Sequence, residues 1–264
     1  MKVYHGKSVF GGIAIGKTAV YKKSEQQVKR VKTEDSDGEW ARYQAAREAS
    51  IEQLGELYDK ACREVGEANA AIFEIHQMML EDEDYNESVE NIIRSQMVNA
   101  EYAVASTADN FAQMFEAMDD DYMRGRAADV RDISERVITV LAGGAGGGLD
   151  SDEPVIIAAD DLAPSETVQL DKDKVLSFVT AHGSENSHTA ILARTMGIPA
   201  LIGTGIDLDE SVDGKLGIVD GTNGVVYVDP DAELLEEMKK KQQEEQEKKR
   251  LLQTLKGKEN ITLD

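Results

Sequence analysis

The sequence is poor in cysteine, proline, aromatic residues and positive charge. Its 264 residues include one cysteine, four prolines and 5% aromatic residues, and 51 acidic side chains against 29 basic ones give a net charge of −22. A single cysteine cannot form an internal disulfide, which favours a reducing compartment. A chain this acidic repels nucleic-acid phosphates and anionic lipid, so we expect no nucleic-acid and no membrane partner.

Long apolar runs are missing too. The N-terminus lacks the continuous apolar segment and the cleavage-site pattern of a signal peptide. No stretch approaches the roughly 18–20 apolar residues of a membrane-spanning helix. No proline occurs before Pro154, which permits long uninterrupted helices in the first half of the chain. We therefore expect a cytoplasmic protein that is rich in helix.

The acidic charge is concentrated in a region with helical periodicity. Residues 34–140 carry 26 acidic and 9 basic side chains, and apolar residues recur there at steps of three or four. The pattern predicts a first helix that Gly66 weakens or ends, a second over 72–80, a long third over 89–118 and a fourth over 127–141. Short connections between long amphipathic helices predict an antiparallel bundle.

The glycine-rich run at 143–148 ends the helical region, and the periodicity then changes. Short β-rich runs follow, with one helical segment, HTAILARTM, between the second and the third. These runs cover 155–159, 175–179, 200–203, 216–220 and 224–228. Residues 3–21 are β-rich and are expected to join the same sheet. The predicted fold is therefore α/β with an inserted all-α bundle and a C-terminal linker helix.

The predicted domain boundaries follow these changes of pattern. The α/β unit comprises 1–32 and 149–230, the helical subdomain comprises 33–148, and a charged linker helix occupies 231–264. The linker helix leads to no further domain, so the chain is expected to be a fragment of a longer protein.

The segment 182–199 holds the clearest chemical signal. The run VLSFV feeds a polar loop that opens a helix, with Ser187 as the expected N-cap. Gly197 is the expected residue after the helix end, and Pro199 blocks its continuation. A strand, a polar loop and a helix start in this order are typical of an anion-binding site.

His188 occupies the first turn of this helix. Free backbone N–H groups and the helix dipole favour an anion there and disfavour an imidazolium, so the ring is expected to be neutral. A neutral imidazole beside a bound phosphate can accept a phosphoryl group. A first-turn histidine is more often a polar capping residue, and His182 in the same loop is a second candidate acceptor.

The segment SENSHTAILARTMGIPALIGTG resembles the active-site segment of Enzyme I of the bacterial phosphoenolpyruvate:sugar phosphotransferase system. Other segments match the same family in the same order: GIAIGKT (12–18), AIFEIHQMMLEDED (71–84), RAADVRDISERV (126–137) and DLAPSETVQL (161–170). The resemblance implies an α/β phosphohistidine domain of the swivelling type with a helical insertion. It also implies that His188 is phosphorylated at Nε2, rather than His182.

The active-site loop departs from the family pattern at three positions. Ser184, Glu185 and Asn186 stand where glycine, arginine and threonine are usual. These departures affect the loop geometry and the rate, and they leave the identity of the acceptor unchanged.

In Enzyme I the helical subdomain docks HPr, a phosphocarrier that presents a basic, partly apolar face around its own histidine. The resemblance therefore implies an HPr-binding surface on the bundle. Its expected residues are Glu67, Glu74, Met78, Met79, Glu83, Asp84, Tyr85, Met123 and Arg126. The stretch from Glu67 to Glu90 contains eight acidic residues and no lysine or arginine, which suits such a partner. In the structural alternative, Met79 is core and the acids keep the helix soluble.

The resemblance assigns a role to Thr167 as well. This residue aligns with a family threonine near the resting histidine, where it would hold the imidazole; it could equally be part of an ordinary helix cap.

Enzyme I continues into a barrel that binds phosphoenolpyruvate and Mg²⁺ and forms the homodimer. Because the chain stops where that barrel would begin, the resemblance implies a monomeric fragment that holds no cofactor. Such a fragment would exchange phosphate with HPr, for sugar uptake, but would not phosphorylate itself from phosphoenolpyruvate.

Two other functions are kept as alternatives. The first is the swivelling phosphohistidine domain of a pyruvate phosphate dikinase or phosphoenolpyruvate synthase, which would normally lack the long acidic insertion. The second is a non-catalytic helical adaptor, in which His188 would be dispensable.

Overall fold

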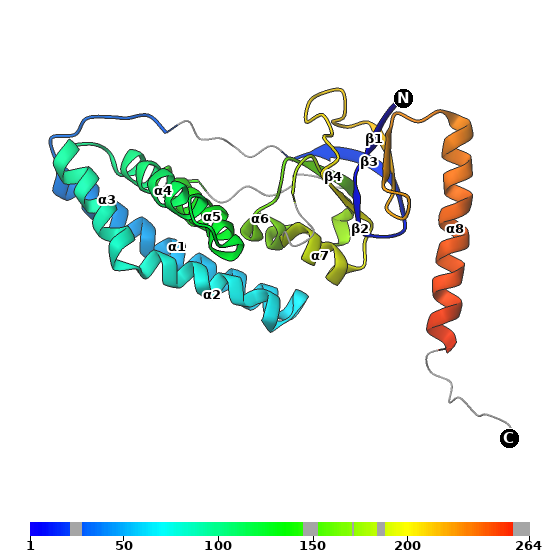
Figure 1. Ribbon diagram of the computed structural model, residues 1–264, viewed down its shortest axis with the longest axis horizontal. Coiled ribbons are helices and arrows are strands. Elements are labelled where there is room, and N and C mark those ends of the chain that lie inside the picture. Colours follow the sequence, from blue (N-terminus) through cyan, green and yellow to red (C-terminus); the bar gives the residue numbers. More distant parts are fainter. Residues whose placement is uncertain (22–27, 145–152, 171, 184–187, 256–264) are drawn as a thin grey trace, which may run out of the picture. The chain divides into compact units, whose positions relative to one another are not determined.

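The computed structural model describes residues 1–21, 28–144, 153–170, 172–183 and 188–255 (Figure 1). The chain divides into two compact units. The α/β unit comprises Met1–Lys22, Asp150–Leu162 and Asp171–Asp264, and the helical unit comprises Lys23–Leu149 and Ala163–Leu170. This combination confirms the predicted fold class.

The α/β unit is built on one sheet among the described residues. Its strands are β1 (Lys2–His5), β2 (Lys7–Phe10), β3 (Ile13–Val20), β4 (Val155–Ala159), β5 (Val175–Thr180), β6 (Ala200–Ile202), β7 (Leu216–Asp220) and β8 (Val225–Val228). They lie in the order β1-β8-β7-β3-β4-β5-β6-β2. The neighbours from β3 to β6 are parallel and the remaining pairs are antiparallel. The N-terminal strands join this sheet, as predicted.

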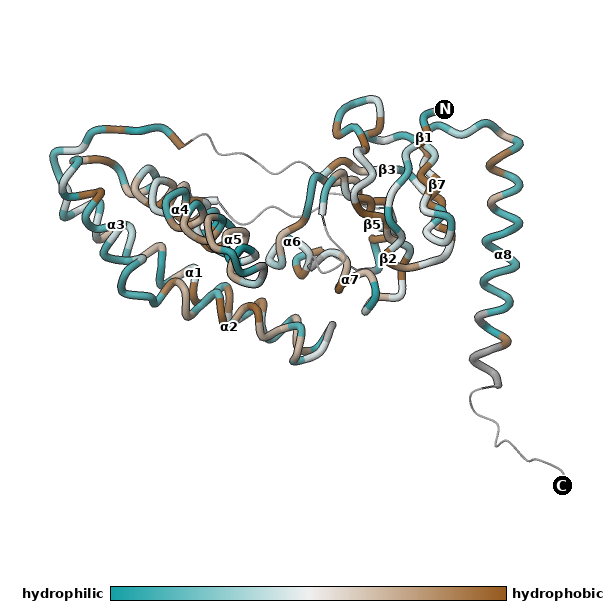
Figure 2. The backbone as a smooth tube through the Cα atoms, viewed as in Figure 1, coloured by the Kyte–Doolittle hydropathy of each residue, from teal (hydrophilic) through white to brown (hydrophobic). Residues whose placement is uncertain are grey.

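The central strands are apolar because both of their faces are covered. All five residues of β4 are buried, and its Ile156 packs with Val179 of β5 and Val219 of β7 in one core cluster. Strands buried on both faces are expected to be continuously hydrophobic, and they appear brown in Figure 2.

Helices complete the α/β unit. They are α7 (His188–Met196), a short 3₁₀ turn (Lys172–Lys174) and α8 (Ala232–Leu255). The buried Met238 of α8 packs against Ile13 and Ile218, and Gln242 Nε2 donates to the Ile13 carbonyl at 2.9 Å. The predicted linker helix therefore packs against the sheet through its first half. No helix of the described chain is long and apolar enough to cross a membrane.

Gly6 lies between β1 and β2, the two strands that form the opposite edges of the sheet. It separates β1, which pairs with β8, from β2, which pairs with β6 at the opposite edge. Gly6 N donates to the Gly224 carbonyl at 2.9 Å. A Cβ atom at Gly6 would lie 2.4 Å from Thr204 Cγ2 and 2.8 Å from the Ile202 carbonyl oxygen. Only glycine fits this close approach without a shift of the backbone.

The helical unit contains five long helices among the described residues. They are α1 (Ser36–Val65), α2 (Glu67–Glu81), α3 (Glu83–Gln96), α4 (Ala100–Glu116) and α5 (Asp121–Leu141). Aspartates begin three of them: the side chains of Asp35, Asp82 and Asp120 accept backbone N–H groups of α1, α3 and α5. Gly66, with φ of 88°, ends α1 as predicted.

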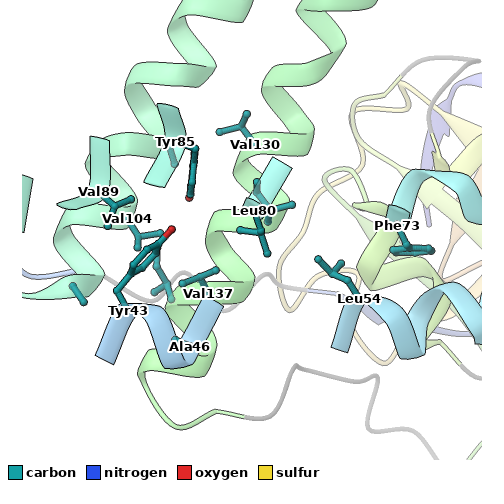
Figure 3. Close-up of a cluster of buried hydrophobic side chains, with 14 of the residues drawn as sticks. Tyr43, Ala46, Leu54, Phe73, Leu80, Tyr85, Val89, Val104, Val130 and Val137 are labelled. Carbon is teal, nitrogen blue, oxygen red and sulfur yellow. The ribbon is translucent and has the colours of Figure 1, made fainter. Parts of the chain in front are cut away.

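Apolar side chains from all five helices fill the core of the helical unit. Figure 3 shows Tyr43 from α1, Leu80 from α2, Tyr85 from α3, Val104 from α4 and Val137 from α5 converging in this cluster. The Tyr43 hydroxyl donates to Asn86 Oδ1 at 2.8 Å. Burial raises the pKa of Tyr43, so its hydroxyl stays protonated.

The predicted third helix is wrong in one respect, because it is broken into α3 and α4. Met97 adopts a left-handed conformation (φ of 50°) at the end of α3, and the Val98 N–H turns back to the Ile93 carbonyl. Lys32 then pairs with Val98 in an isolated β-bridge. A non-glycine residue at positive φ is unusual, so the sequence gives no warning of this break.

One segment differs from the predicted domain boundaries. The short helix α6 (Pro164–Gln169) groups with the helical unit although its flanking segments belong to the α/β unit. Val168 packs in the helical core, and the Ser165 hydroxyl donates to Asp132 Oδ1 of α5 at 2.5 Å. These contacts join residues that are distant in sequence, so local patterns do not predict them.

The close approach of Gly6 to the end of β6 can be tested by substitution. Gly6→Ala is expected to lower the free energy of unfolding by about 1–3 kcal/mol, because the new methyl group meets the backbone of β6. Gly125→Ala is the matched control: nothing lies within 4 Å of its Cβ position in α5, so the same change should stabilise by about 0.5–1 kcal/mol. Urea unfolding measures the free energy of unfolding of both variants. Equal changes in the two would contradict the close approach at Gly6.

Candidate active site

The start of α7 is held in place by one buried face. Thr189, Ala190 and Ala193 are buried, and the Thr189 hydroxyl donates to the Leu162 carbonyl at 3.3 Å. At the other end, Gly197 has φ of 67° and follows the last turn, as predicted. Because both ends of this nine-residue helix are fixed, its N-terminal N–H groups occupy a defined position beside the sheet.

His188 is the first residue of α7. Its side chain lies outside the described part of the structure, and so do the whole residues Ser184, Glu185, Asn186 and Ser187, which include the predicted N-cap and the three family departures. The backbone position of His188, directly before the buried Thr189, is that expected of an anion-site residue at a helix start.

His182 follows β5 and contacts the residue that follows β4. Its N–H donates to the Asp160 carbonyl at 2.9 Å, and its Nδ1 lies 2.6 Å from Asp160 Oδ1. Both side chains are largely exposed. The Thr180 hydroxyl donates to the His182 carbonyl at 2.5 Å, and Gly183 follows with φ of 108°. His182, the second candidate acceptor, therefore links the end of β4 to the end of β5 through these hydrogen bonds.

Thr167 lies on α6 in the helical unit. The residue is buried, and its hydroxyl donates to the Pro164 carbonyl at 2.8 Å. The hydroxyl oxygen keeps its capacity to accept a hydrogen bond. The Glu166 carboxylate accepts the Ala163 N–H at 2.7 Å and begins the helix. Thr167 is thus an interior residue of α6 with a hydroxyl of fixed orientation.

The acidic residues predicted to dock a partner are exposed. Four carboxylates lie on α2 and the first turn of α3: Glu67, Glu74, Glu83 and Asp84. Within the described residues none of them forms an ion pair, whereas Glu90, at the end of the same run, pairs with Arg94 at 2.7 Å. This negative charge is therefore available to a basic partner.

The apolar residues predicted for the same surface differ in exposure. Met78 is 68% exposed, whereas Met79 is half-buried against the helical core. Met123 is also half-buried. Arg126 is mostly covered: its guanidinium stacks over the Tyr122 ring at 4.6 Å and pairs with Asp129 at 3.0 Å.

Tyr85 does not lie on a docking surface, which corrects its predicted role. It is 2% exposed, and its ring packs edge-on against Phe111 in the core. Its hydroxyl lies 2.6 Å from Ser134 Oγ, and burial raises its pKa to about 12 although this hydrogen bond opposes the shift. Acidic residues surround it in the sequence, although its backbone N–H donates to the Asp82 side chain at 3.0 Å and its ring is buried.

Sequence reasoning missed three exposed apolar residues of the helical unit. Met114 and Met118, at the end of α4, are 61% and 37% exposed, and Tyr122 at the start of α5 is 67% exposed. The methionines fitted the period of the predicted long helix. Because the break at Met97 ends α3 and starts a new helix, the helical periodicity before it does not continue into α4. The buried face of α4 is instead formed by its alanines, with Val104 and Thr107. Exposed methionines and tyrosines are typical of transient protein contacts.

Comparison with known proteins identifies the family. Residues 5–126 match the family described as "PEP-utilising enzyme, N-terminal", and residues 151–224 match "PEP-utilising enzyme, mobile domain". An NMR solution structure of Enzyme I is 37% identical, with a TM-score of 0.76, and the alignment covers 92% of this chain and 99% of that one. The chain belongs to the Enzyme I family. The N-terminal domain of "Enzyme 1 - Nitrogen" is a more distant match, at 26% identity and a TM-score of 0.61, over 90% of this chain and 98% of that one.

Full-length members of the Enzyme I family are longer than this chain. The phosphoenolpyruvate-protein phosphotransferase of Bacillus sp. (strain S) is 40% identical over 89% of the chain and 41% of its own length. The enzyme of the same name from Haemophilus influenzae is 38% identical over 96% of the chain and 44% of its own length. The chain therefore spans less than half of these relatives. Within its described residues, no group of three or more His, Cys, Asp or Glu side chains is arranged to hold a metal ion.

The buried position of Tyr85 generates a prediction about alkaline stability. Its pKa of about 12 exceeds the ordinary value of 10, so between these pH values the unfolded chain loses the proton first and stability falls as pH rises. Tyr85→Phe should lack this component of the alkaline loss, and at neutral pH it should lower the free energy of unfolding by about 1–3 kcal/mol because Ser134 loses its partner. Urea unfolding at neutral and alkaline pH tests this, and identical alkaline profiles of the two proteins would refute the burial of the hydroxyl.

Proposed function

We propose that this chain is the phosphohistidine and HPr-binding half of an Enzyme I, and that His188 exchanges a phosphoryl group with HPr. The observation that carries the proposal is the position of His188 as first residue of a helix whose buried face fixes its start, in a chain of the Enzyme I family. Backbone N–H groups at that helix start favour the phosphate and a neutral imidazole.

The transfer is an in-line displacement at phosphorus. The Nε2 lone pair of neutral His188 attacks the phosphorus of phospho-HPr, a new N–P bond forms, and the N–P bond of the donor breaks. The electron pair returns to the ring of the HPr histidine, and the proton on His188 Nδ1 stays in place. The product is again a phosphoramidate, so the step is reversible. We also propose Thr167 as a residue that takes part in the transfer, on the resemblance to the family; its hydroxyl donates to the Pro164 carbonyl, and its oxygen can still accept a hydrogen bond.

The helical unit would supply the docking surface. Its exposed carboxylates at Glu67, Glu74, Glu83 and Asp84 suit the basic face of HPr, and Met78 adds apolar contact. We extend this surface to three exposed residues: Met114 on α4, Met118 in the turn after α4 and Tyr122 on α5. Charge attraction speeds association, while small apolar contacts allow fast release, as a carrier requires.

The phosphoenolpyruvate chemistry is assigned to a part of the relatives that this chain does not cover. The curated relatives are named for phosphoenolpyruvate, and the chain aligns with 41–46% of their length. We therefore propose that phosphoenolpyruvate, Mg²⁺ and dimerisation depend on that remaining part, and that this chain acts as a monomer in the cytoplasmic pathway of sugar uptake. A dikinase domain is less favoured, because the match to Enzyme I includes the helical unit over nearly its whole length.

Labelling by phospho-HPr tests the acceptor. Incubation with HPr phosphorylated at its histidine should place one acid-labile phosphate on the chain, and His188→Ala should abolish it because no other ring has the helix-start environment. His182→Ala is the matched control and should be labelled. ATP, or phosphoenolpyruvate with Mg²⁺ but no HPr and no other Enzyme I, should give no label. Labelled His188→Ala protein would exclude His188 as the acceptor.

Charge reversal tests the docking surface. Glu83→Lys with Asp84→Lys should weaken HPr binding about tenfold or more at low salt, since each reversal replaces attraction by repulsion. Calorimetry with unphosphorylated HPr over a range of ionic strength measures the effect. The control pair, Glu236→Lys with Glu237→Lys, changes the charge equally on α8 and should leave affinity intact. Equal losses in the two variants would indicate only a general charge effect.

A further inference from the structure

A stripe of three side chains on α5 runs from the surface of the helical unit into its interior. Tyr122, Arg126 and Asp129 are spaced by four and three residues, so they lie on one face of the helix. Tyr122 is exposed, the side chain of Arg126 is 14% exposed, and Asp129 is buried. The stripe therefore connects an exposed aromatic ring to a buried carboxylate through a guanidinium group.

The guanidinium of Arg126 contacts Tyr122 in two ways. Its Cζ lies over the ring, 4.6 Å from the ring centroid, and its Nη2 donates to the Tyr122 hydroxyl. A cation over an aromatic face is attracted by the quadrupole of the ring. The stacking restrains the ring plane and the hydrogen bond restrains the end of the side chain. An exposed side chain that would otherwise sample several rotamers is therefore held in one of them.

Asp129 holds the guanidinium from the interior. Its Oδ2 accepts a hydrogen bond from Arg126 Nη1 at 3.0 Å, and its Oδ1 lies 3.3 Å from Nε2 of His76, a fully buried residue of α2. The two oxygens of one carboxylate thus face groups on two helices, which restrains its rotation. A buried ion pair contributes little net stability, because desolvation offsets attraction, so the effect of this pair is to specify where both side chains lie.

The ring that this stripe restrains belongs to a group of exposed apolar side chains. Met114 on α4, Met118 in the turn after α4 and Tyr122 on α5 follow one another along the chain, and all three are exposed. Aromatic and methionine side chains are enriched where proteins bind one another, and a few aromatic anchors carry much of the binding energy. A ring that is ordered before binding loses less conformational entropy when the partner arrives. The restraint on Tyr122 therefore bears on affinity.

We infer that Asp129 is a positioning residue for partner binding: through Arg126 it holds the Tyr122 ring in the orientation that the partner meets. The inference rests on the proposed function, because it takes HPr as the partner and Tyr122 as part of the docking surface. Arg126, predicted as a docking residue, then supports that surface from within. Without the Asp129 carboxylate the guanidinium loses its buried partner, so it is expected to turn toward water and release the ring.

The order of the Tyr122 ring in the free protein tests the first step. Carbon-13 relaxation of the ring should show greater mobility in Asp129→Ala than in the wild type. Asp129→Asn keeps the shape of the side chain, so it serves if the alanine variant does not fold, and it should change the ring in the same direction.

Asp132→Ala is the matched control for these variants. Asp132 is equally buried on α5 and also faces His76, at 3.7 Å, but its Oδ1 accepts the Ser165 hydroxyl instead of a hydrogen bond from Arg126. Its removal should cost stability, measured as a lower melting temperature, and leave the order of the Tyr122 ring as in the wild type.

Calorimetry with unphosphorylated HPr tests the second step. Asp129→Ala should weaken binding about three- to tenfold, because the ring must then be ordered on binding, whereas Asp132→Ala should stay within about twofold of the wild type. Tyr122→Ala should weaken binding at least as much as Asp129→Ala. The double variant of Asp129 and Tyr122 should lose no more than Tyr122→Ala alone, since Asp129 acts through the ring. A merely structural role of Asp129 does not produce this non-additivity.

The outcomes that would overturn the inference can be told apart. A ring as ordered in both Asp129 variants as in the wild type removes the positioning step. Losses of affinity that add in the double variant, or that are equal in Asp129→Ala and Asp132→Ala, remove its effect on binding. A wild-type chain that does not bind HPr removes the proposed docking instead, and the ring order in the free protein still reports whether Asp129 holds Tyr122.

Discussion

The packing of one face of α7 is the constraint on which the chemistry proposed for this chain depends. Thr189, Ala190 and Ala193 are buried on that face, and they place His188 at the start of the helix. If the helix began one residue later or rotated by a third of a turn, the first-turn N–H groups would no longer face the same place. The small side chains matter here, because they let the helix approach the sheet closely enough to fix its position.

The residues with proposed roles in the transfer belong to different units. His188 and the loop before it belong to the α/β unit, whereas α6, with Thr167, belongs to the helical unit that also carries the acidic surface. The backbone crosses between the units on both sides of α6. The orientation of α6 therefore depends on its side-chain contacts, among them the buried hydrogen bond from Ser165 to Asp132. The residues proposed for docking thus belong to one unit, and the proposed acceptor belongs to the other.

Much of the fold follows from local patterns in the sequence. The short apolar runs became β4 to β8, and HTAILARTM became α7 between its expected bounds. Among these strands, the parallel strands β4, β5 and β6 are almost continuously buried, which explains their continuous hydrophobicity. Other features depend on distant contacts. The break at Met97 needs a bridge from Lys32, and the burial of Tyr85 needs Phe111 and Ser134. The grouping of α6 needs Asp132, 33 residues away in sequence. In each case the local pattern is compatible with more than one outcome, and a tertiary contact selects one.

The central claim is that His188 accepts phosphate at Nε2 while its other nitrogen keeps a proton. Long-range ¹H–¹⁵N correlation spectra of the ring nitrogens, recorded on protein labelled with ¹⁵N-histidine before and after addition of phospho-HPr, test it most directly. The account predicts that one neutral ring, absent from the spectrum of His188→Ala, changes its Nε2 resonance, gains a coupling to phosphorus there and retains its Nδ1 proton. Phosphorus coupled to Nδ1, or a phosphorylated ring that persists in His188→Ala, would contradict the account.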